Sequence, residues 1–251
     1  MGDSGMKVIG SFVSPYVRKV LACLHLKGLA YEIDPITAFF GGEEFERLSP
    51  LRRIPVLIDG DFALTDSSVI CAYLEEAYPG RPLLPAGARD RARARWLEEY
   101  GDTRLGDVFI WGLFYPKFVH PAIFGEPGDQ ARIDETLAED MPRELDYLEG
   151  QLPENGFLFG GQIGLADISI ATYFRNAAYL GFSPDAERWP RTAAFADRAL
   201  AHPCFAATLP FEQAQMSTDP KGRRAALVDA GAPLTANTLG TRQPRRGVMR
   251  L

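Results

Sequence analysis

The most informative part of the sequence is Arg53-Ile-Pro-Val-Leu-Ile-Asp-Gly-Asp-Phe-Ala-Leu-Thr-Asp-Ser67. Two short apolar runs, Val56–Ile58 and Phe62–Leu64, flank an Asp-Gly-Asp turn. Because glycine readily adopts a positive φ, Gly60 suits a tight turn between two strands. The stretch therefore predicts an antiparallel hairpin.

A helix is expected directly after this hairpin. Asp66 or Ser67 can cap its first turn through a side-chain oxygen. Apolar residues then recur at the i, i+3, i+4, i+7 spacing of one buried face, namely Ile70, Tyr73, Leu74 and Ala77. The pattern predicts strand, strand and helix in that order from Val56 onward.

Pro55 stands at the start of the first strand of the hairpin, where a residue without an N–H group is tolerated. If the peptide bond before it is cis, the backbone of Val56 would face outward. Its N–H and C=O would then be open to a chain that adds to the sheet. Pro55 is therefore expected to be structural and Val56 to bind a ligand.

The residues before the hairpin predict a β-α-β unit. Strands are expected at Lys7–Gly10 and Tyr31–Pro35, with a helix between them that starts at Ser14 and ends at Gly28. The apolar face of this helix holds Val17, Val20, Leu21 and Leu24. Its charged residues are expected on the other faces: Arg18, Lys19 and Lys27. With a short helix through Gly42–Leu48, the order becomes βαβαββα.

The segment Gly80–Gly87 marks a domain boundary, because it holds two prolines and two glycines between helical patterns. The sequence after this segment shows no strand pattern. Helices are expected over residues 88–115, 129–152, 165–179 and 189–201, with a short one after Pro203. The predicted parts are an α/β domain (1–82), a linker (83–90), an all-helical domain (91–215) and a C-terminal extension (216–251).

Ser14 opens the first helix, and its position favours an anion. A serine hydroxyl there can donate its hydrogen to a group beside the helix N-terminus, whose partial positive charge attracts the same group. Both effects would shift a bound thiol toward thiolate, so the enzyme need not supply the sulfur nucleophile itself. Ser11 is the competing hydroxyl, and its alternative role is that of a turn former.

The order βαβαββα, the Ser14-Pro15-Tyr16 motif and the Ile54-Pro55-Val56-Leu57 motif together resemble the cytosolic glutathione transferases of the serine type. The resemblance covers residues of about 6 to 215. It implies a thioredoxin-like domain followed by an all-α domain, with glutathione as co-substrate. It also implies that Ser14 stabilises the glutathione thiolate.

The resemblance assigns roles to further residues near Pro55. It implies a cis bond before Pro55 and pairing of Val56 with the cysteinyl backbone of glutathione. The γ-glutamyl end would be held by Asp66, where the family more often has Glu, and by Ser67. Arg53 would meet the glycyl carboxylate, a contact that a guanidinium can make with two hydrogen bonds. Arg52 is the alternative for this last role.

The pocket for an electrophile is expected between the domains. Tyr16 stands at the start of the first helix, and four residues recur on one face of the long helix: Val108, Trp111, Tyr115 and Phe118. Such a stripe also suits a core, so only Tyr16, Trp111 and Tyr115 are assigned to the pocket. Gly101, Gly106 and Gly112 interrupt this helix and indicate bending or close packing.

Asp167 lies in Phe159–Ser169, a stretch that is similar to a helix-capping sequence of the same family. The cap position is Gly164, which has no side chain to return a hydrogen bond. The expected role of Asp167 is therefore structural.

Composition excludes several other classes. The chain has 251 residues with 46% hydrophobic and 24% charged residues, which is typical of a soluble globular protein. Its three cysteines and three histidines show neither disulfide nor metal spacing, so no metal is expected. A formal charge of −6 argues against nucleic acid as a partner. Without a signal sequence or an apolar run of about 18 residues, a cytoplasmic protein that does not enter membranes is expected.

Two segments have no assigned role. The extension from Ser217 is rich in Arg, Gly and Pro, and it is expected to lie across the surface or to be partly mobile. Contact with an acidic partner or a second subunit is the alternative. Phe39-Phe40 precedes Gly41-Gly42 and could cover the ligand, touch a second subunit or pack onto its own domain.

The expected function is that of a glutathione transferase, homodimeric by resemblance, that serves in detoxification. Ser14 would activate the glutathione thiol for attack on a small hydrophobic electrophile. The alternatives are a glutathione-dependent isomerase, dehalogenase or peroxidase, or a non-catalytic binding module with the same fold.

Overall fold

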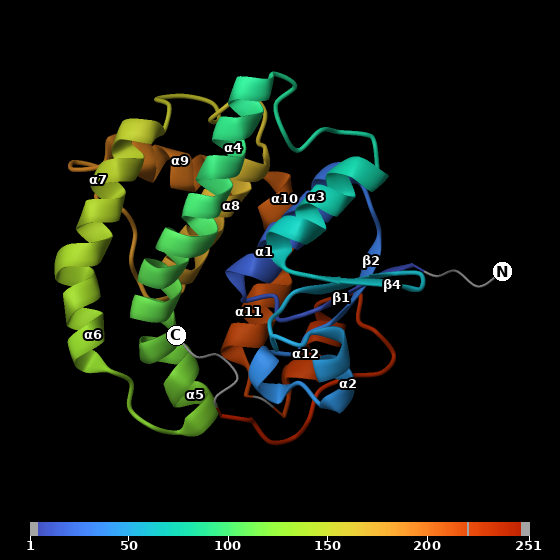
Figure 1. The fold of residues 1–251 in the computed structure, drawn as a ribbon. Helices are drawn as coiled ribbons and strands as arrows, with labels where there is room; N and C mark the ends of the chain where they lie inside the picture. Colours follow the sequence, from blue (N-terminus) through green and yellow to red (C-terminus); the bar gives the residue numbers. More distant parts are fainter. Residues whose placement is uncertain (1–4, 220, 247–251) are drawn as a thin grey trace. The chain divides into compact units, whose positions relative to one another are not determined.

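The computed structural model describes residues 5–219 and 221–246 (Figure 1). Contacts divide the chain into two compact units. The first comprises residues up to Arg81 together with those from Pro203 onward, and the second is Pro82–His202. We describe each unit by itself.

The first unit contains a four-stranded sheet in the order β2-β1-β3-β4. The strands are β1 (Met6–Ile9), β2 (Tyr31–Asp34), β3 (Val56–Asp59) and β4 (Phe62–Thr65). β1 pairs parallel with β2 and antiparallel with β3, and the β3–β4 hairpin turns at Gly60, whose φ is +63°. The helices are α1 (Pro15–Lys27), η1 (Ala38–Phe40), α2 (Glu43–Leu48), α3 (Ser67–Ala77), α10 (Pro203–Ala206), α11 (Leu209–Ser217) and α12 (Arg223–Asp229). The predicted order βαβαββα is confirmed.

α1 begins and ends as its sequence predicts. The Ser14 hydroxyl accepts a hydrogen bond from the Val17 N–H at 3.4 Å, and Gly28 ends the helix with a left-handed φ of +67°. Arg18 and Lys19 are expected on faces of α1 other than the apolar one, and in the structure these faces are buried as well. Their side chains are fully buried, because each finds a polar partner inside the unit.

Arg18 forms an ion pair with Glu212 of α11. Its Nη2 lies 2.9 Å from Glu212 Oε2 and its Nε donates to Oε1 at 3.1 Å, while the two side chains are 1% and 0% exposed. Phe12 and Phe211 also stack, with their ring centroids 5.1 Å apart. These contacts assign residues 203–217 to the first unit, whereas the helical pattern alone placed 203–215 with the second.

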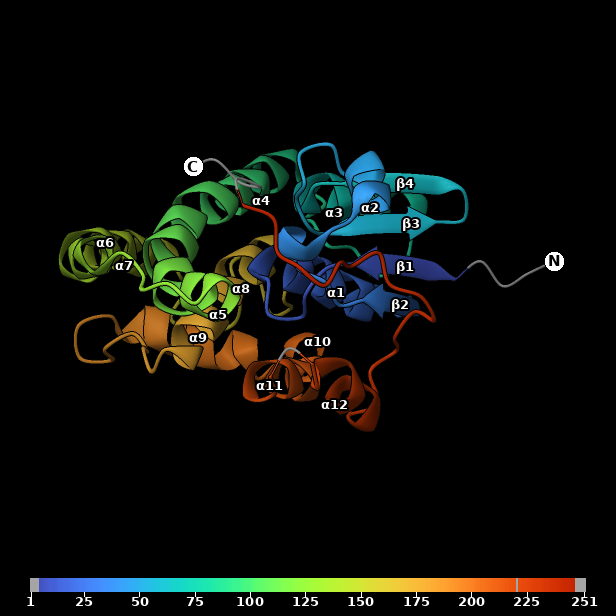
Figure 2. The same cartoon turned by 90° about the horizontal axis from the view of Figure 1, so that it is seen from below.

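The C-terminal extension lies on the first unit over its described residues, as the sequence predicts for a surface segment. The Ile33 N–H donates to the Pro233 carbonyl at 2.7 Å, and the Thr235 N–H donates to the Ile33 carbonyl at 3.0 Å. This pairing runs parallel to β2 and covers its outer edge. Figure 2 shows the extension running from α12 past β2.

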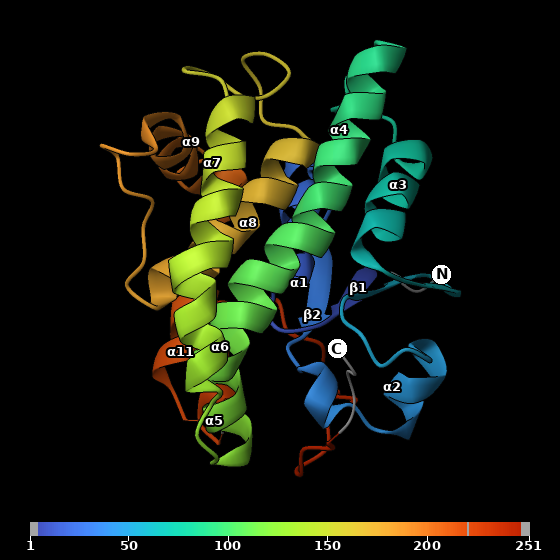
Figure 3. The ribbon, with the colours of Figure 1, turned by 60° about the vertical axis from the view of Figure 1, so that its left-hand side comes forward.

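The second unit is helical throughout its regular structure, as predicted. Its helices are α4 (Ala88–Tyr100), η2 (Gly101–Val119, a π-helix), α5 (His120–Phe124), α6 (Gln130–Glu135), η3 (Thr136–Asp140, also π), α7 (Met141–Gln151), α8 (Leu165–Tyr179) and α9 (Pro190–Leu200). In Figure 3, α4, η2 and α5 continue one another as a single long helix, and so do α6, η3 and α7.

Two of the glycines in the long helix permit close packing, as expected. A Cβ at Gly101 would lie 2.7 Å from the Ser169 carbonyl oxygen of α8. A Cβ at Gly112 would lie 2.5 Å from the Thr136 hydroxyl. Since Cβ atoms do not approach backbone oxygens this closely, Gly101 is what lets η2 meet α8.

Asp167 is a structural residue of the second unit, as predicted. Its Oδ2 accepts from the Gly164 N–H at 2.9 Å and its Oδ1 accepts from the Leu158 N–H at 2.8 Å. Burial raises the pKa of this carboxyl to about 6, although both N–H groups act in the opposite direction. The cap residue is glycine for a spatial reason as well, because a Cβ at Gly164 would lie 3.0 Å from the Leu83 carbonyl oxygen.

Replacing Asp167 by asparagine should lower the free energy of unfolding by about 1–3 kcal/mol. The amide NH₂ would replace one of the two acceptor oxygens, so the N–H of Leu158 or Gly164 would lose its partner. Urea unfolding of the two proteins at the same pH measures the difference. Equal stability would contradict this role for the carboxylate.

Candidate functional site

The candidate site forms where three strand ends meet in the first unit. In the sheet, Val56 lies opposite Ile9 of β1 on one side and Thr65 of β4 on the other. Because both pairs are antiparallel, Pro55 is next to the residues that follow Ile9 and those that follow Thr65. The register therefore brings together the loop to Ser14, the stretch before Val56 and the start of α3.

Gly10 permits the closest of these contacts. Its φ is +152°, and a Cβ there would lie 2.4 Å from Val17 Cγ2 and 3.3 Å from Ile54 Cβ. Only glycine fits this position without displacing α1 or the Ile54 side chain. Gly10 was not predicted to belong to the site, although its position at the end of β1 was the available signal.

The Ile54–Pro55 peptide bond is cis, as expected, but Val56 does not have the predicted open backbone. Val56 is fully buried and has a strand on each side, so its N–H and C=O face protein and not a ligand. Ile54 lies before the first residue of β3 and is half-buried. Ile54, the residue before Pro55, is therefore the one whose backbone lies outside the strand ladder.

The two candidate hydroxyls, those of Ser11 and Ser14, have different hydrogen-bond partners. The Ser11 hydroxyl is buried and donates to Gln215 Oε1 at 3.1 Å. Ser14 is half-buried, and its oxygen accepts from Val17 N–H. Among the described residues, no acceptor takes the Ser14 hydroxyl hydrogen. The arrangement favours Ser14 as the donor to a ligand.

Asp66 and Ser67 begin α3. Asp66 Oδ1 accepts from the N–H groups of Ser68 at 3.0 Å and Val69 at 3.2 Å, which confirms Asp66 as the cap. Its φ of +75° with ψ of 126° is unusual for a residue with a side chain and is the kind of outlier that clusters at ligand sites. Asp66 is exposed and Ser67 is buried.

Arg52 and Arg53 differ in their surroundings. The Arg52 guanidinium pairs with Glu46 and donates to the Gly41 carbonyl at 3.0 Å, with 13% of its side chain exposed. The Arg53 side chain is exposed, while its N–H donates to the Ser49 hydroxyl at 3.0 Å. Of the two alternatives, Arg53 is the one available to a ligand carboxylate.

The predicted pocket residues fall in both units. Tyr16 belongs to the first unit and is half-buried. Trp111 and Tyr115 belong to the second, where their ring centroids lie 5.3 Å apart. His120, which was not predicted, continues this aromatic row, with its ring centroid 5.8 Å from that of Tyr115. That these residues form one pocket stays a prediction.

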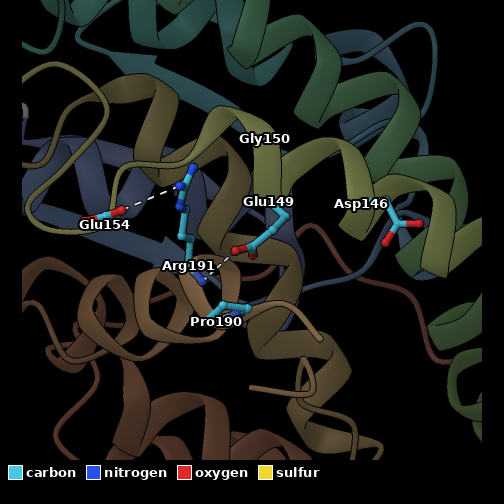
Figure 4. A pocket seen from close by; sticks show the side chains of 6 residues that line it. All are labelled: Asp146, Glu149, Gly150, Glu154, Pro190 and Arg191. Atoms are coloured by element: carbon cyan, nitrogen blue, oxygen red, sulfur yellow. Dashed lines mark hydrogen bonds and ion pairs between the residues drawn. The ribbon is translucent and has the colours of Figure 1, made fainter. Parts of the chain in front are cut away.

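A hollow on the second unit contains none of the predicted residues. It is lined by Asp146, Glu149, Gly150, Glu154, Pro190 and Arg191 (Figure 4). Its acidic groups have structural partners. Glu149 accepts from the N–H groups of Arg191 and Thr192 at the start of α9, each at 2.9 Å, and Asp146 accepts from Trp189 Nε1 at 2.6 Å.

Neither a metal-binding cluster nor a membrane-spanning helix is found among residues 5–219 and 221–246. No three His, Cys, Asp or Glu side chains gather there as they would around a metal ion. Within the same residues, no helix is both long and apolar enough to cross a bilayer.

Comparison with known proteins identifies the family. The glutathione S-transferase N-terminal domain matches residues 8–82, and the glutathione S-transferase C-terminal domain matches residues 130–198. The chain is 33% identical over 171 residues to glutathione S-transferase 3 of Zea mays, covering 66% of this chain and 75% of the relative. The chain belongs to the glutathione S-transferase family. The serine-type subclass assigned from Ser14 stays a prediction.

The relatives of this glutathione S-transferase include an enzyme named for a different activity. The chain is 30% identical to maleylacetoacetate isomerase of Pseudomonas aeruginosa, with 83% of this chain and 97% of the relative covered. Its fold is similar to the crystal structure of a glutathione S-transferase from Rhodospirillum rubrum, with a TM-score of 0.77, 27% identity, and 88% and 99% of the two chains covered. The family thus carries glutathione-dependent transferases and isomerases on one fold.

Proposed function

We propose that this glutathione S-transferase uses Ser14 to activate the thiol of glutathione for attack on a small hydrophobic electrophile. The observation that carries the proposal is the position of the Ser14 hydroxyl. It caps α1, a helix of 13 residues with no acidic residue in its first turn, and its hydrogen has no acceptor among the described residues.

The chemistry follows from this position. A thiolate beside the start of α1 would accept a hydrogen bond from the Ser14 hydroxyl, while the Ser14 oxygen accepts from the Val17 N–H. The helix dipole adds partial positive charge at the same place. Both interactions favour the thiolate over the thiol, so the thiol pKa of about 8.5 falls and more nucleophile is present at neutral pH.

The rest of glutathione would be held by the residues around Pro55. The cysteinyl backbone would pair with Ile54, since Val56 is enclosed in the sheet. The γ-glutamyl end would meet Asp66 and Ser67 at the start of α3, and the glycyl carboxylate would meet Arg53. Tyr16, Trp111 and Tyr115 would contact the electrophile.

The test measures glutathione binding by titration calorimetry and turnover with a panel of halogenated aromatics, α,β-unsaturated carbonyls, cis-enoic acids and hydroperoxides. We expect binding, and conjugation of an electrophile with loss of free thiol. Turnover of a cis-enoic acid without loss of thiol would instead support an isomerase, which the similarity to maleylacetoacetate isomerase favours as the second candidate. The same panel distinguishes dehalogenase and peroxidase activities. Glutathione binding without any turnover would support the non-catalytic binding module.

We also propose a homodimer in the cytoplasm with a role in detoxification. Exposed apolar side chains on the first unit support a second copy as partner: Leu51 (71% exposed), Phe62 (46%) and Val69 (50%). Light scattering of the full chain measures the mass, and a monomer at micromolar concentration would contradict the dimer.

A further inference from the structure

We propose that Arg245, carried by the C-terminal extension, joins Arg53 in binding the glycyl carboxylate of glutathione. This inference rests on the proposed function and adds a specificity-determining residue to the same site. The extension contacts β2, the η1–α2 loop, Glu46 and the apolar cluster that contains Ile54.

The backbone of the extension is anchored at the end of β2 and at the start of α2, and one of its side chains packs on the cluster that contains Ile54. The Leu239 N–H donates to Asp34 Oδ2 at 2.7 Å, and the Gly42 N–H donates to the Leu239 carbonyl at 3.0 Å. The Leu239 side chain packs on the same apolar cluster as Ile54. A segment that shares a core with Ile54 is a fixed part of the site's surroundings.

The next residues of the extension run along the η1–α2 loop. The Thr241 N–H donates to the Phe40 carbonyl at 2.6 Å, and the Arg245 N–H donates to the Phe39 carbonyl at 2.8 Å. The loop residues from Ala38 to Gly42 contain no cationic side chain. The extension therefore adds Arg245 to a surface on which Arg52 already donates to the Gly41 carbonyl.

Glu46 fixes the Arg245 side chain. Arg245 Nη1 lies 3.0 Å from Glu46 Oε1, and the same oxygen pairs with Arg52 Nη1. Burial and the nearby charge of Arg245 lower the pKa of Arg52. One carboxylate thus faces two guanidiniums, and Arg53 follows directly in the chain.

Two arginines of this region remain available to a ligand. Arg52 and Arg245 share one carboxylate oxygen of Glu46, and Arg53 forms no ion pair among the described residues. Arg245 is half-exposed and makes this one ion pair among the described residues, so donors of its guanidinium remain open. A carboxylate is the anion whose geometry matches such a group.

The test compares glutathione with its glycyl monoethyl ester, which lacks that carboxylate charge. Titration calorimetry on the full chain gives the dissociation constants for the unmodified protein, Arg245→Gln and Arg53→Gln. Arg242→Gln is the matched control, because Arg242 lies in the same exposed segment and has no partner among the described residues. We expect Arg245→Gln to weaken glutathione binding by roughly three- to tenfold and to leave ester binding unchanged.

Each outcome decides the proposal. The proposal is supported if Arg245→Gln and Arg53→Gln reduce the preference for glutathione over the ester. Arg242→Gln should keep this preference, and Arg245→Lys should restore it. Equal loss for both ligands, or the same loss in Arg242→Gln, overturns the assignment. An unchanged preference in Arg245→Gln also overturns it while the proposed function stands. Failure of the unmodified protein to bind glutathione overturns both.

Discussion

Replacing Ser14 by alanine should leave glutathione binding nearly intact and lower kcat/KM for conjugation by roughly 10²- to 10³-fold. The variant loses the single hydroxyl donor that would face the thiolate, while the contacts to the rest of glutathione remain. The pKa of the bound thiol should therefore rise toward the free value of about 8.5. Ultraviolet absorbance of the thiolate, titrated with bound glutathione, measures this shift.

Two further variants make this test specific to Ser14. Ser14→Thr keeps the hydroxyl and should keep most of the activity. Ser11→Ala removes a hydroxyl that is already bonded to Gln215, so it should change stability more than the thiol pKa. If Ser14→Ala binds glutathione with the same thiol pKa as the unmodified protein, Ser14 has no part in thiol activation.

Replacing Glu212 by alanine should lower the free energy of unfolding by about 3–5 kcal/mol. The change leaves the Arg18 guanidinium charged and without its carboxylate in a place where 1% of the side chain is exposed. Thr208 would also lose one of the two acceptors of its hydroxyl, Glu212 Oε1 at 3.0 Å, and would keep the Phe205 carbonyl at 3.2 Å. Urea unfolding of the full chain gives the difference in free energy.

A double variant tests the cause of this loss. Arg18→Met together with Glu212→Leu replaces the pair by apolar side chains, and we expect a much smaller loss than for Glu212→Ala alone. Because Arg18 lies in the second turn of α1, the pair also fixes the helix that carries Ser14. A double variant as unstable as Glu212→Ala would show that the packing of α11, and not the buried charge, is responsible.

Much of the first unit could be predicted because its signals are local. The turn at Gly60, the cap at Ser14 and the glycine that ends α1 each act within a few residues, and the structure contains all three. Alternation and helical spacing gave the order of strands and helices for the same reason.

The errors concern residues whose partners are distant in the chain. The sequence around Arg18 does not predict its burial, because its carboxylate partner Glu212 lies 194 residues later. Val56 looks open to a ligand until β1 and β4 are both paired with it. Neither partner leaves a local pattern in the sequence.

The order of the elements and the resemblance to the family follow from the sequence alone, because capping, turns and side-chain periodicity depend on neighbouring residues. For the activating hydroxyl, the sequence favoured Ser14 and kept Ser11 as the alternative. The folded structure was needed to show that residues 203–217 belong to the unit that contains the sheet, that Ile54 and not Val56 lies outside the ladder, and that Arg245 pairs with Glu46. These contacts join residues that are far apart in the chain, and burial of charge and pairing of strands exist only after the chain has folded.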